Sequence, residues 1–135
     1  MTADAMNCQK TIAAKVLEKE ADYILAVKSN HAVLYDEIKR YMDDMVGRSA
    51  PGFESVEKEH GRIEIRRCWQ SEDISWCADQ KHWPGLKSFC AIESIREHNG
   101  HTASTRRYYI SSLGYDVARV AKSIREHWHI ENSLH

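Results

Sequence analysis

The stretch that decides the fold is FCAIESIREHNGHTASTRRYYIS, residues 89–111. Residues 89–96 alternate between two sets of side chains, which is the period of two that a β-strand imposes. The dipeptide Asn99-Gly100 follows, and it is typical of tight hairpin turns because both residues tolerate positive φ. Residues 105–111 then supply a second strand. The sequence therefore predicts an antiparallel pair closed by this turn.

Upstream of this pair, Ile63 and Ile65 alternate with charged residues, so we predict another strand over Arg62 to Arg67. The segment 76–86 is irregular and contains the turn Trp83-Pro84-Gly85, while the tryptophans at 69, 76 and 83 are expected in the core. A breaker-rich loop at 47–52 separates this β-rich region from what precedes it. We therefore expect three parts: 1–47, a β-rich 53–113, and 114–135.

The N-terminal part alternates helix, strand and helix, an α/β pattern. Asn7 is expected to cap a short first helix. The continuous apolar run Tyr23 to Val27 suits a central parallel strand covered on both faces, with its partner strand lying ahead of Asp4. A second helix follows and should stop at Gly47, and its apolar stripe consists of Leu34, Ile38, Tyr41, Met42 and Met45.

From Asp116 the helical period returns, with one stripe formed by Val117, Val120, Ala121, Ile124 and Trp128. Glu131 falls near the middle of that stripe, so a continuous helix directs its carboxylate toward the core. A carboxylate there requires a cation, a hydrogen-bonded partner or a shifted pKa, and a metal ion would meet the need. The alternative is a helix that ends near His129 and leaves Glu131 in water.

Asp4 is the second candidate metal ligand. It lies just before a helix start in an α/β pattern, where a strand would end, and such folds keep their sites at the carboxyl ends of strands. The alternative is ordinary capping of the helix N-terminus by an aspartate.

Composition excludes several classes of protein. Nineteen Lys and Arg residues nearly balance 20 Asp and Glu residues, for a net charge of -1, so any contact with nucleic acid must come from local patches. The four cysteines have no metal-binding spacing and are expected to be reduced, and His98 and His101 are expected to be exposed beside a turn. Without a secretory signal or an apolar span, we expect a cytoplasmic protein with no membrane partner.

Five segments together resemble the H-repeat-associated transposases, which are linked to Rhs elements and insertion sequences. They are TADAMNCQ (2–9), DYILAVKSN (22–30), HGRIEIR (60–66), YYISS (108–112) and IREHWHIENSLH (124–135). Any one of these strings is weakly specific, but they occur in the family's order and approximate spacing along essentially the whole chain.

The resemblance implies a DDE transposase, an enzyme that cuts and joins DNA at insertion-sequence ends. It implies a partial ribonuclease H-like core, interrupted by a β-rich insertion before the glutamate helix. Asp4 matches the family's second catalytic aspartate and Glu131 its glutamate, whereas the first aspartate lies upstream and has no match here. Related transposases carry a tyrosine and an arginine where this chain has Ile124 and His127, and the family's sequence continues past both ends.

The resemblance also implies a cofactor, Mg²⁺ or Mn²⁺, in a two-ion site of the intact parent enzyme. Two divalent ions activate the attacking oxygen and stabilise the leaving oxygen in phosphodiester cleavage, and carboxylate oxygens are suitable ligands. Because one carboxylate has no match, we expect the chain alone to be inactive or nearly so.

Contact with DNA is expected from Arg62, Arg66, Arg67, Arg106 and Arg107, near Tyr108 and Tyr109, and from His127. The alternative is that Glu64, Glu93 and Asp73 pair with these arginines across strands. A homo-oligomer, or a mixed oligomer with a full-length transposase, is a further expected partner.

Three functions are therefore open. The first is a transposase fragment derived from an enzyme. The second is a non-catalytic DNA-binding or assembly module that modulates a full-length transposase. The third is a remnant that folds poorly because an unpaired strand edge invites aggregation.

Overall fold

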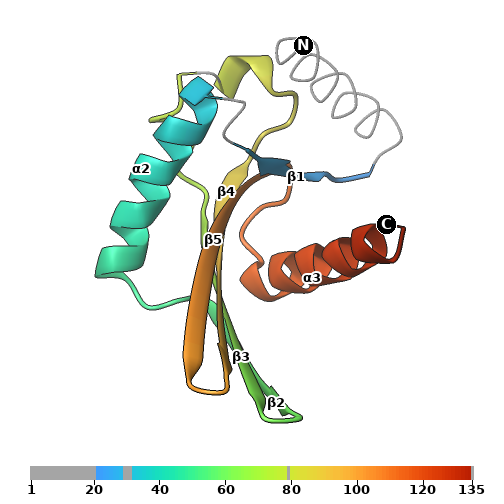
Figure 1. Cartoon of the computed structure of the whole chain (residues 1–135). Coiled ribbons are helices and arrows are strands. Elements are labelled where there is room, and N and C mark those ends of the chain that lie inside the picture. The colour runs from blue at the N-terminus through green and yellow to red at the C-terminus, as the bar shows by residue number, and fades with distance from the viewer. Residues whose placement is uncertain (1–20, 29–31, 79, 135) are drawn as a thin grey trace.

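A computed structural model describes residues 21–28, 32–78 and 80–134, and of residues 127–134 it describes the helical backbone alone. One antiparallel sheet forms the centre, with strand order β1-β5-β4-β3-β2. Helices α2 and α3 lie on its two opposite faces (Figure 1). The strands are β1 (Ile24–Val27), β2 (Phe53–Glu59), β3 (Arg62–Ser71), β4 (Ser88–His98) and β5 (His101–Ser111). The helices are α2 (Ala32–Arg48), α3 (Val117–Leu134) and the short 3₁₀ helix η1 (Gln80–His82).

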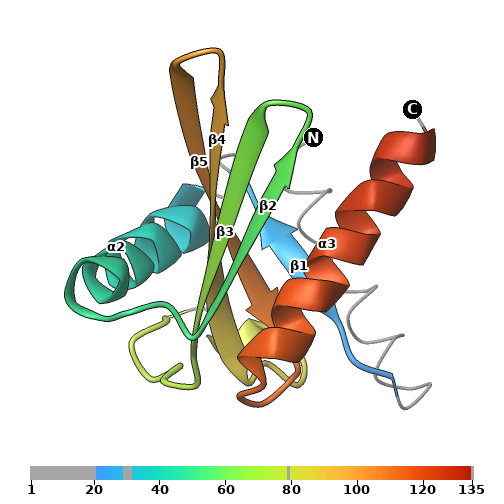
Figure 2. The ribbon, with the colours of Figure 1, turned by 90° about the horizontal axis from the view of Figure 1, so that it is seen from below.

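The hairpin expected around Asn99-Gly100 is confirmed. β4 and β5 pair antiparallel from Ser88↔Ser111 to His98↔His101, with Asn99 at φ 51° and Gly100 at φ 77° between them. The β2–β3 hairpin closes in the same way, with His60 at φ 50° and Gly61 at φ 77°. Both tips extend beyond the helices (Figure 2). Two positive φ values in a two-residue turn match the twist of the flanking strands.

The prediction of a central parallel strand over Tyr23 to Val27 is wrong. β1 pairs antiparallel with β5, from Ile24↔Ser111 to Val27↔Tyr108, and it is the edge strand of the described sheet. Its apolar character is nevertheless explained by cover on both faces, since Leu25 packs with the α2 cluster and Ile24 and Ala26 with the α3 cluster. Burial on both faces makes a strand uniformly apolar whichever direction its partner runs.

The strand β1 and the strands β2 to β5 thus belong to one sheet, although the expected boundary at 47–52 lies between them. The division of the chain into 1–47, 53–113 and 114–135 remains a prediction. The first helix, capped by Asn7, and the residue Asp4 lie outside the described residues.

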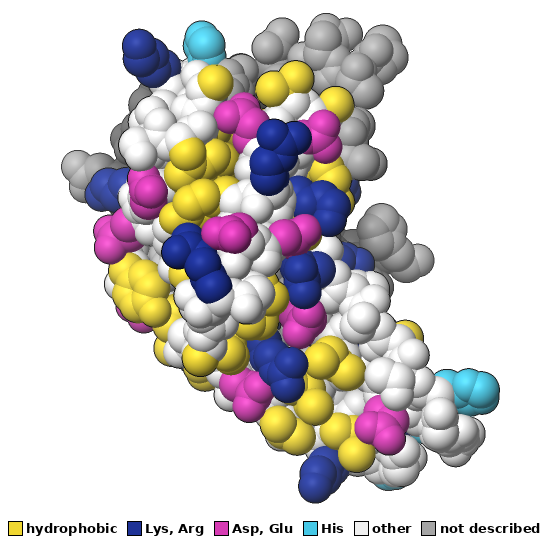
Figure 3. Space-filling model, turned by 90° about the vertical axis from the view of Figure 1, so that its left-hand side faces the viewer, with side chains coloured by type: hydrophobic (Ala, Val, Ile, Leu, Met, Phe, Trp, Pro, Cys, Tyr) yellow, Lys and Arg dark blue, Asp and Glu magenta, His cyan; other side chains and the backbone are white. Residues whose placement is uncertain are grey.

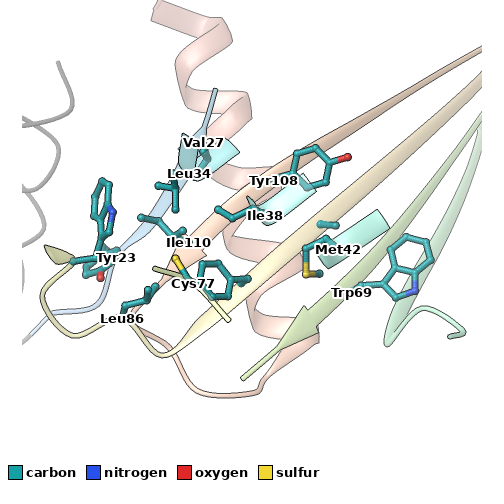
Figure 4. Packing of buried hydrophobic residues seen from close by; sticks show 13 residues of the cluster. Tyr23, Val27, Leu34, Ile38, Met42, Trp69, Cys77, Leu86, Tyr108 and Ile110 are labelled. Carbon is teal, nitrogen blue, oxygen red and sulfur yellow. The ribbon is translucent and has the colours of Figure 1, made fainter. Parts of the chain in front are cut away.

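The α2 face holds the larger core. Leu34, Ile38 and Met42 are the buried residues of α2, and they confirm the predicted stripe, although the helix continues through Gly47 to Arg48. They pack on a cluster that includes Trp69, Phe89 and Ile110 from the sheet (Figure 4). Trp83 is also buried in it, and Trp76 packs against it, as expected for these tryptophans.

The α3 face holds a second core, formed by Val117, Val120 and Ile124 against Cys68 and Cys90. Cys68, Cys77 and Cys90 are buried thiols, and burial raises the pKa of the Cys68 thiol to about 12, so these thiols serve as packing groups. No helix in the described part of the chain is both long enough and apolar enough to cross a membrane.

Candidate nucleic-acid interface

The α2 face of the sheet carries a row of alternating charges across four strands. The strand register aligns Glu54, Arg67, Glu93 and Arg106 side by side. Arg67 Nε donates to Glu54 Oε2 at 2.6 Å, and Arg106 Nη2 donates to Glu93 Oε2 at 2.7 Å. Arg67 Nη1 also reaches Glu93 at 3.5 Å. Opposite charges therefore alternate along this row, which stabilises cross-strand pairs.

Asp43 of α2 extends this row to the helix. Its Oδ1 accepts from Arg106 Nη1 at 2.9 Å and from the Tyr108 hydroxyl at 2.6 Å, and its Oδ2 accepts from Lys39 Nζ at 2.8 Å. Burial on its own would raise the pKa of Asp43, but the hydrogen bonds from Lys39, Tyr108 and Arg106 outweigh it and hold the pKa below its usual value. Asp43 thus joins α2 to the sheet through charged hydrogen bonds.

Arg67 and Arg106, two of the predicted DNA contacts, are therefore held by carboxylates on the α2 face. Basic and acidic side chains are interspersed over the side of the molecule that carries α2 (Figure 3). Of the pairings across strands that the sequence offered as an alternative, Glu93 forms them with Arg67 and Arg106. Glu64 bonds instead to Arg66 of its own strand, and Asp73 bonds to Ser75.

On the α3 face a small, open depression lies between the sheet and α3. Its polar lining comes from Arg66 of β3, Ser94 and Arg96 of β4, and Thr105 and Arg107 of β5. Its apolar lining comes from Ile92, Tyr109 and Ile124, the last from α3. Arg62 points to the same side as Arg66, because residues four apart on a strand share a face, and it is exposed near the β2–β3 tip.

Glu64 contacts two arginines of this depression. Arg66 Nε donates to Glu64 Oε1 at 2.6 Å, and Arg96 Nε lies 3.7 Å from Glu64 Oε2. Burial would raise the pKa of Glu64, but the hydrogen bond from Arg66 and the charges of Arg66, Arg96 and Arg125 keep it lowered. Glu57, directly opposite Glu64 on β2, forms its own ion pair with Arg125 of α3. The lowered pKa keeps Glu64 ionised at neutral pH.

A buried glutamine fixes the start of α3 on the sheet. Gln70 Nε2 donates to Ser88 Oγ and to the Gly114 carbonyl, both at 3.0 Å, and Gln70 Oε1 accepts from the Asp116 backbone N–H at 2.9 Å. Asp116 then caps the helix, since its Oδ1 accepts from the Arg119 N–H at 3.4 Å. The direction in which α3 leaves the sheet is therefore set inside the core.

The two predicted metal ligands are not placed as side chains. Asp4 lies outside the described residues, and Glu131 and His127 lie on α3 in the part described by its backbone alone. The helix continues through Leu134, so it does not end near His129. Among the residues whose side chains are described, no group of three His, Cys, Asp or Glu could hold a metal ion. His98 and His101 face each other across the exposed β4–β5 tip.

Sequence reasoning missed Arg96 as a member of the arginine group. Arg96 lies on the same face of β4 as Ser94 and Ile92, because residues two apart on a strand share a face. The two-residue Asn99-Gly100 turn pairs His98 with His101, and the same register pairs Ile92 with Arg107. Counting outward from the turn would have placed Arg96 and Arg107 on one face and Arg106 on the other.

Comparison with known proteins assigns the chain to a family. The family model described as "Transposase DDE domain" matches residues 1–135. An uncharacterized protein in the dhlA 3' region of Xanthobacter autotrophicus is 42% identical over 83% of this chain and 38% of its own length. The putative transposase YncI of Escherichia coli O157:H7 is 38% identical over 100% of this chain and 36% of its own length.

The H repeat-associated putative transposase YhhI of Escherichia coli K12 is 36% identical over 100% of this chain and 38% of its own length. The chain therefore spans between 36% and 38% of the length of these three relatives. No solved structure matches it at a significant level. With a family model matching from the first residue to the last, and relatives named as H repeat-associated transposases, the chain belongs to the DDE transposase family.

Proposed function

We propose that this chain is the part of a DDE transposase that supplies two of three metal-binding carboxylates, Asp4 and Glu131, for cutting and joining DNA at insertion-sequence ends. The third carboxylate belongs to sequence upstream of Asp4. In this proposal residues 1–47 and 114–135 belong to a ribonuclease H-like core, and residues 53–113 form the β-rich insertion. Membership of the family supports the proposal.

The observation that carries the proposal is the placement of α3. Its buried residues Val117, Val120 and Ile124 fix one stripe of the helix against the sheet, and its backbone is helical through Leu134. An ideal helix puts position 131 about 700° beyond Ile124, within about 20° of the same stripe. A glutamate at that angle lies on the buried stripe of the helix and not on its solvated face, which suits a carboxylate that binds a metal ion.

The donor chemistry fits Mg²⁺ or Mn²⁺, because carboxylate oxygens are the ligands that such ions prefer. When bound, the ions would supply charge stabilisation and an activated oxygen nucleophile for phosphodiester cleavage. In the intact parent enzyme a site for two ions is expected, and Asp4 and Glu131 would hold part of it.

Mn²⁺ binding tests the proposal directly. The chain should bind Mn²⁺, and Asp4→Asn and Glu131→Gln should each weaken binding about tenfold or more, because each removes a charged ligand. Glu126→Gln, an exposed glutamate on the same helix, is the matched control and should bind as the parent chain does. With Mg²⁺ or Mn²⁺ the chain alone should leave supercoiled DNA intact. Equal Mn²⁺ binding by all variants, or robust nicking, contradicts the proposal.

A second candidate function is a non-catalytic DNA-binding or assembly module that modulates a full-length transposase. The arginines around the α3-face depression favour it, since they need no metal to contact a phosphate. Added to a full-length relative, the chain should reduce transposition in proportion to its concentration, through competition for DNA ends or mixed oligomers. An unchanged transposition rate at saturating chain excludes this role.

A further inference from the structure

We propose that the depression between the sheet and α3 binds the phosphodiester backbone of DNA through Arg66, Arg96 and Arg107. This inference rests on the proposed function, because it names the contact by which the chain would hold its substrate.

The strand register brings the three arginines around a single central residue, Ser94. Arg66 lies directly opposite Ser94 on β3, and Arg96 follows two residues later on the same face of β4. Thr105 lies opposite Ser94 on β5, and Arg107 is two residues further along that strand. Directly opposite residues have Cβ atoms about 5 Å apart, and diagonal neighbours about 7 Å, so each of the other four side chains is a near neighbour of Ser94. Because β4 and β5 are antiparallel, Arg96 and Arg107 lie on opposite sides of Ser94.

These groups are the donors that a phosphodiester accepts. Guanidinium groups donate forked N–H pairs to phosphate oxygens, and serine and threonine hydroxyls add further hydrogen bonds. The apolar part of the lining, formed by Ile92, Tyr109 and Ile124, is buried in the α3-face core, so the polar side chains supply the accessible part of the site.

The charge of the site favours an anion. Arg66 and Arg96 share one carboxylate, that of Glu64. Glu57, the next acidic side chain on this face, is paired with Arg125 of α3. Two guanidinium groups against one shared carboxylate leave a local excess of positive charge, which raises the concentration of a polyanion at the site.

The depression is also close, along α3, to the position of the proposed metal ligand Glu131. Ile124 lines the depression, and position 131 is seven residues further along α3, about 10 Å at the rise of an α-helix.

The experiment measures binding of a short labelled DNA duplex, and of the single strand of the same sequence, in EDTA over a range of salt concentrations. Arg66→Gln, Arg96→Gln and Arg107→Gln should each make the dependence of log affinity on log salt shallower by about 1, and the triple variant should bind at least about tenfold more weakly. Arg40→Gln, an exposed arginine on α2 with the same change of charge, should bind within about twofold of the parent chain.

Two further variants separate this site from a general charge effect. Glu64→Gln should strengthen binding several-fold, because Glu64 competes with the phosphate for Arg66 and Arg96, whereas Glu54→Gln on the α2 face should leave affinity unchanged. Arg67→Gln, adjacent to Arg66 but on the opposite face, should have little effect. Thermal unfolding of each variant checks that the fold is retained.

Equal losses for Arg40→Gln and the three site variants overturn the inference, and so does the absence of DNA binding at low salt. Because EDTA removes divalent ions, Glu131→Gln should bind DNA as the parent chain does. Failure of the arginine site therefore leaves the Mn²⁺ result for Asp4 and Glu131 standing, and failure of Mn²⁺ binding leaves the DNA result standing.

Discussion

On the α2 face, Arg67 and Arg106 each contact two carboxylates, and Asp43 continues the same row into the helix. On the α3 face, Arg66 and Arg96 share the single carboxylate of Glu64, and with Arg107 they line a depression beside α3. The two faces use the same residue types from the same strands. What differs is the ratio of acid to base: Arg67 and Arg106 have three carboxylate partners between them, whereas Arg66 and Arg96 have one.

The largest expected effect comes from a substitution in the core between α2 and the sheet. Ile38 of α2 is fully buried among the residues of the larger core, so Ile38→Ala should lower the free energy of unfolding by about 2–5 kcal/mol through lost transfer energy and a residual cavity. Val33→Ala, at a 72% exposed position of the same helix, should change it by less than about 0.5 kcal/mol. Urea unfolding of the two variants measures both values, and similar losses would show that α2 does not pack as described.

The next effect concerns the link between the sheet and α3. Gln70→Leu leaves the Asp116 N–H and the Gly114 carbonyl without their side-chain partner, which should cost about 2–3 kcal/mol. Hydrogen exchange should show protection lost in the first turns of α3 while α2 keeps its protection. Equal loss of protection in both helices would mean that Gln70 supports the whole sheet and not this helix.

The smallest of the three effects depends on pH. Asp43→Asn removes the charge that Arg106 and Lys39 contact, and because Asp43 is partly exposed the loss should be about 1–2 kcal/mol at neutral pH. The pKa of Asp43 is lower in the folded chain than in the unfolded chain, so its contribution is complete above the unfolded pKa of about 3.9 and disappears as pH falls through the folded pKa.

The stability difference between the parent chain and Asp43→Asn should therefore be constant near neutrality and shrink below about pH 4. Unfolding curves at a series of pH values measure this difference. A difference that persists unchanged in strong acid would show that Asp43 acts through packing rather than through its charge.

Local patterns predicted much of this fold. The stripe Leu34, Ile38 and Met42 and the stripe Val117, Val120 and Ile124 are buried as helical periodicity requires. The β4–β5 hairpin follows from alternation and from one turn dipeptide. These features depend on residues close in sequence, which is why they could be read without knowledge of the tertiary contacts.

Features that depend on distant partners were not predicted. The apolar run of β1 indicates that both of its faces are covered. It does not indicate that its partner is β5 or that the pair is antiparallel. Strand β2 was missed because its two apolar residues, Phe53 and Val56, lie on opposite faces and Val56 is 52% exposed. Because neither face of β2 is buried along its whole length, its sequence shows no regular alternation of apolar and polar residues.

The arginine site was predicted in part. Arg66 and Arg107 were identified by residue type, but so were Arg67 and Arg106, which lie on the other face in ion pairs. Residue type cannot separate adjacent arginines on a strand, because side chains alternate between faces at every step. The partners Glu54, Glu93 and Asp43 come from three different elements, so their pairing with Arg67 and Arg106 required the tertiary structure.

The turn at Asn99-Gly100 has a consequence for how this molecule tolerates change in chain length. Every pair between β4 and β5 is counted from these two residues, including the pair of Ile92 with Arg107, which is seven pairs from the turn. Inserting or deleting one residue near the tip, at an exposed position that contacts neither helix, would exchange the environments of Arg106 and Arg107 while altering neither side chain. A length change in an exposed tip would therefore change which arginine each face of the sheet presents, whereas substitutions at tip positions other than Asn99 and Gly100 would leave the pairing unchanged.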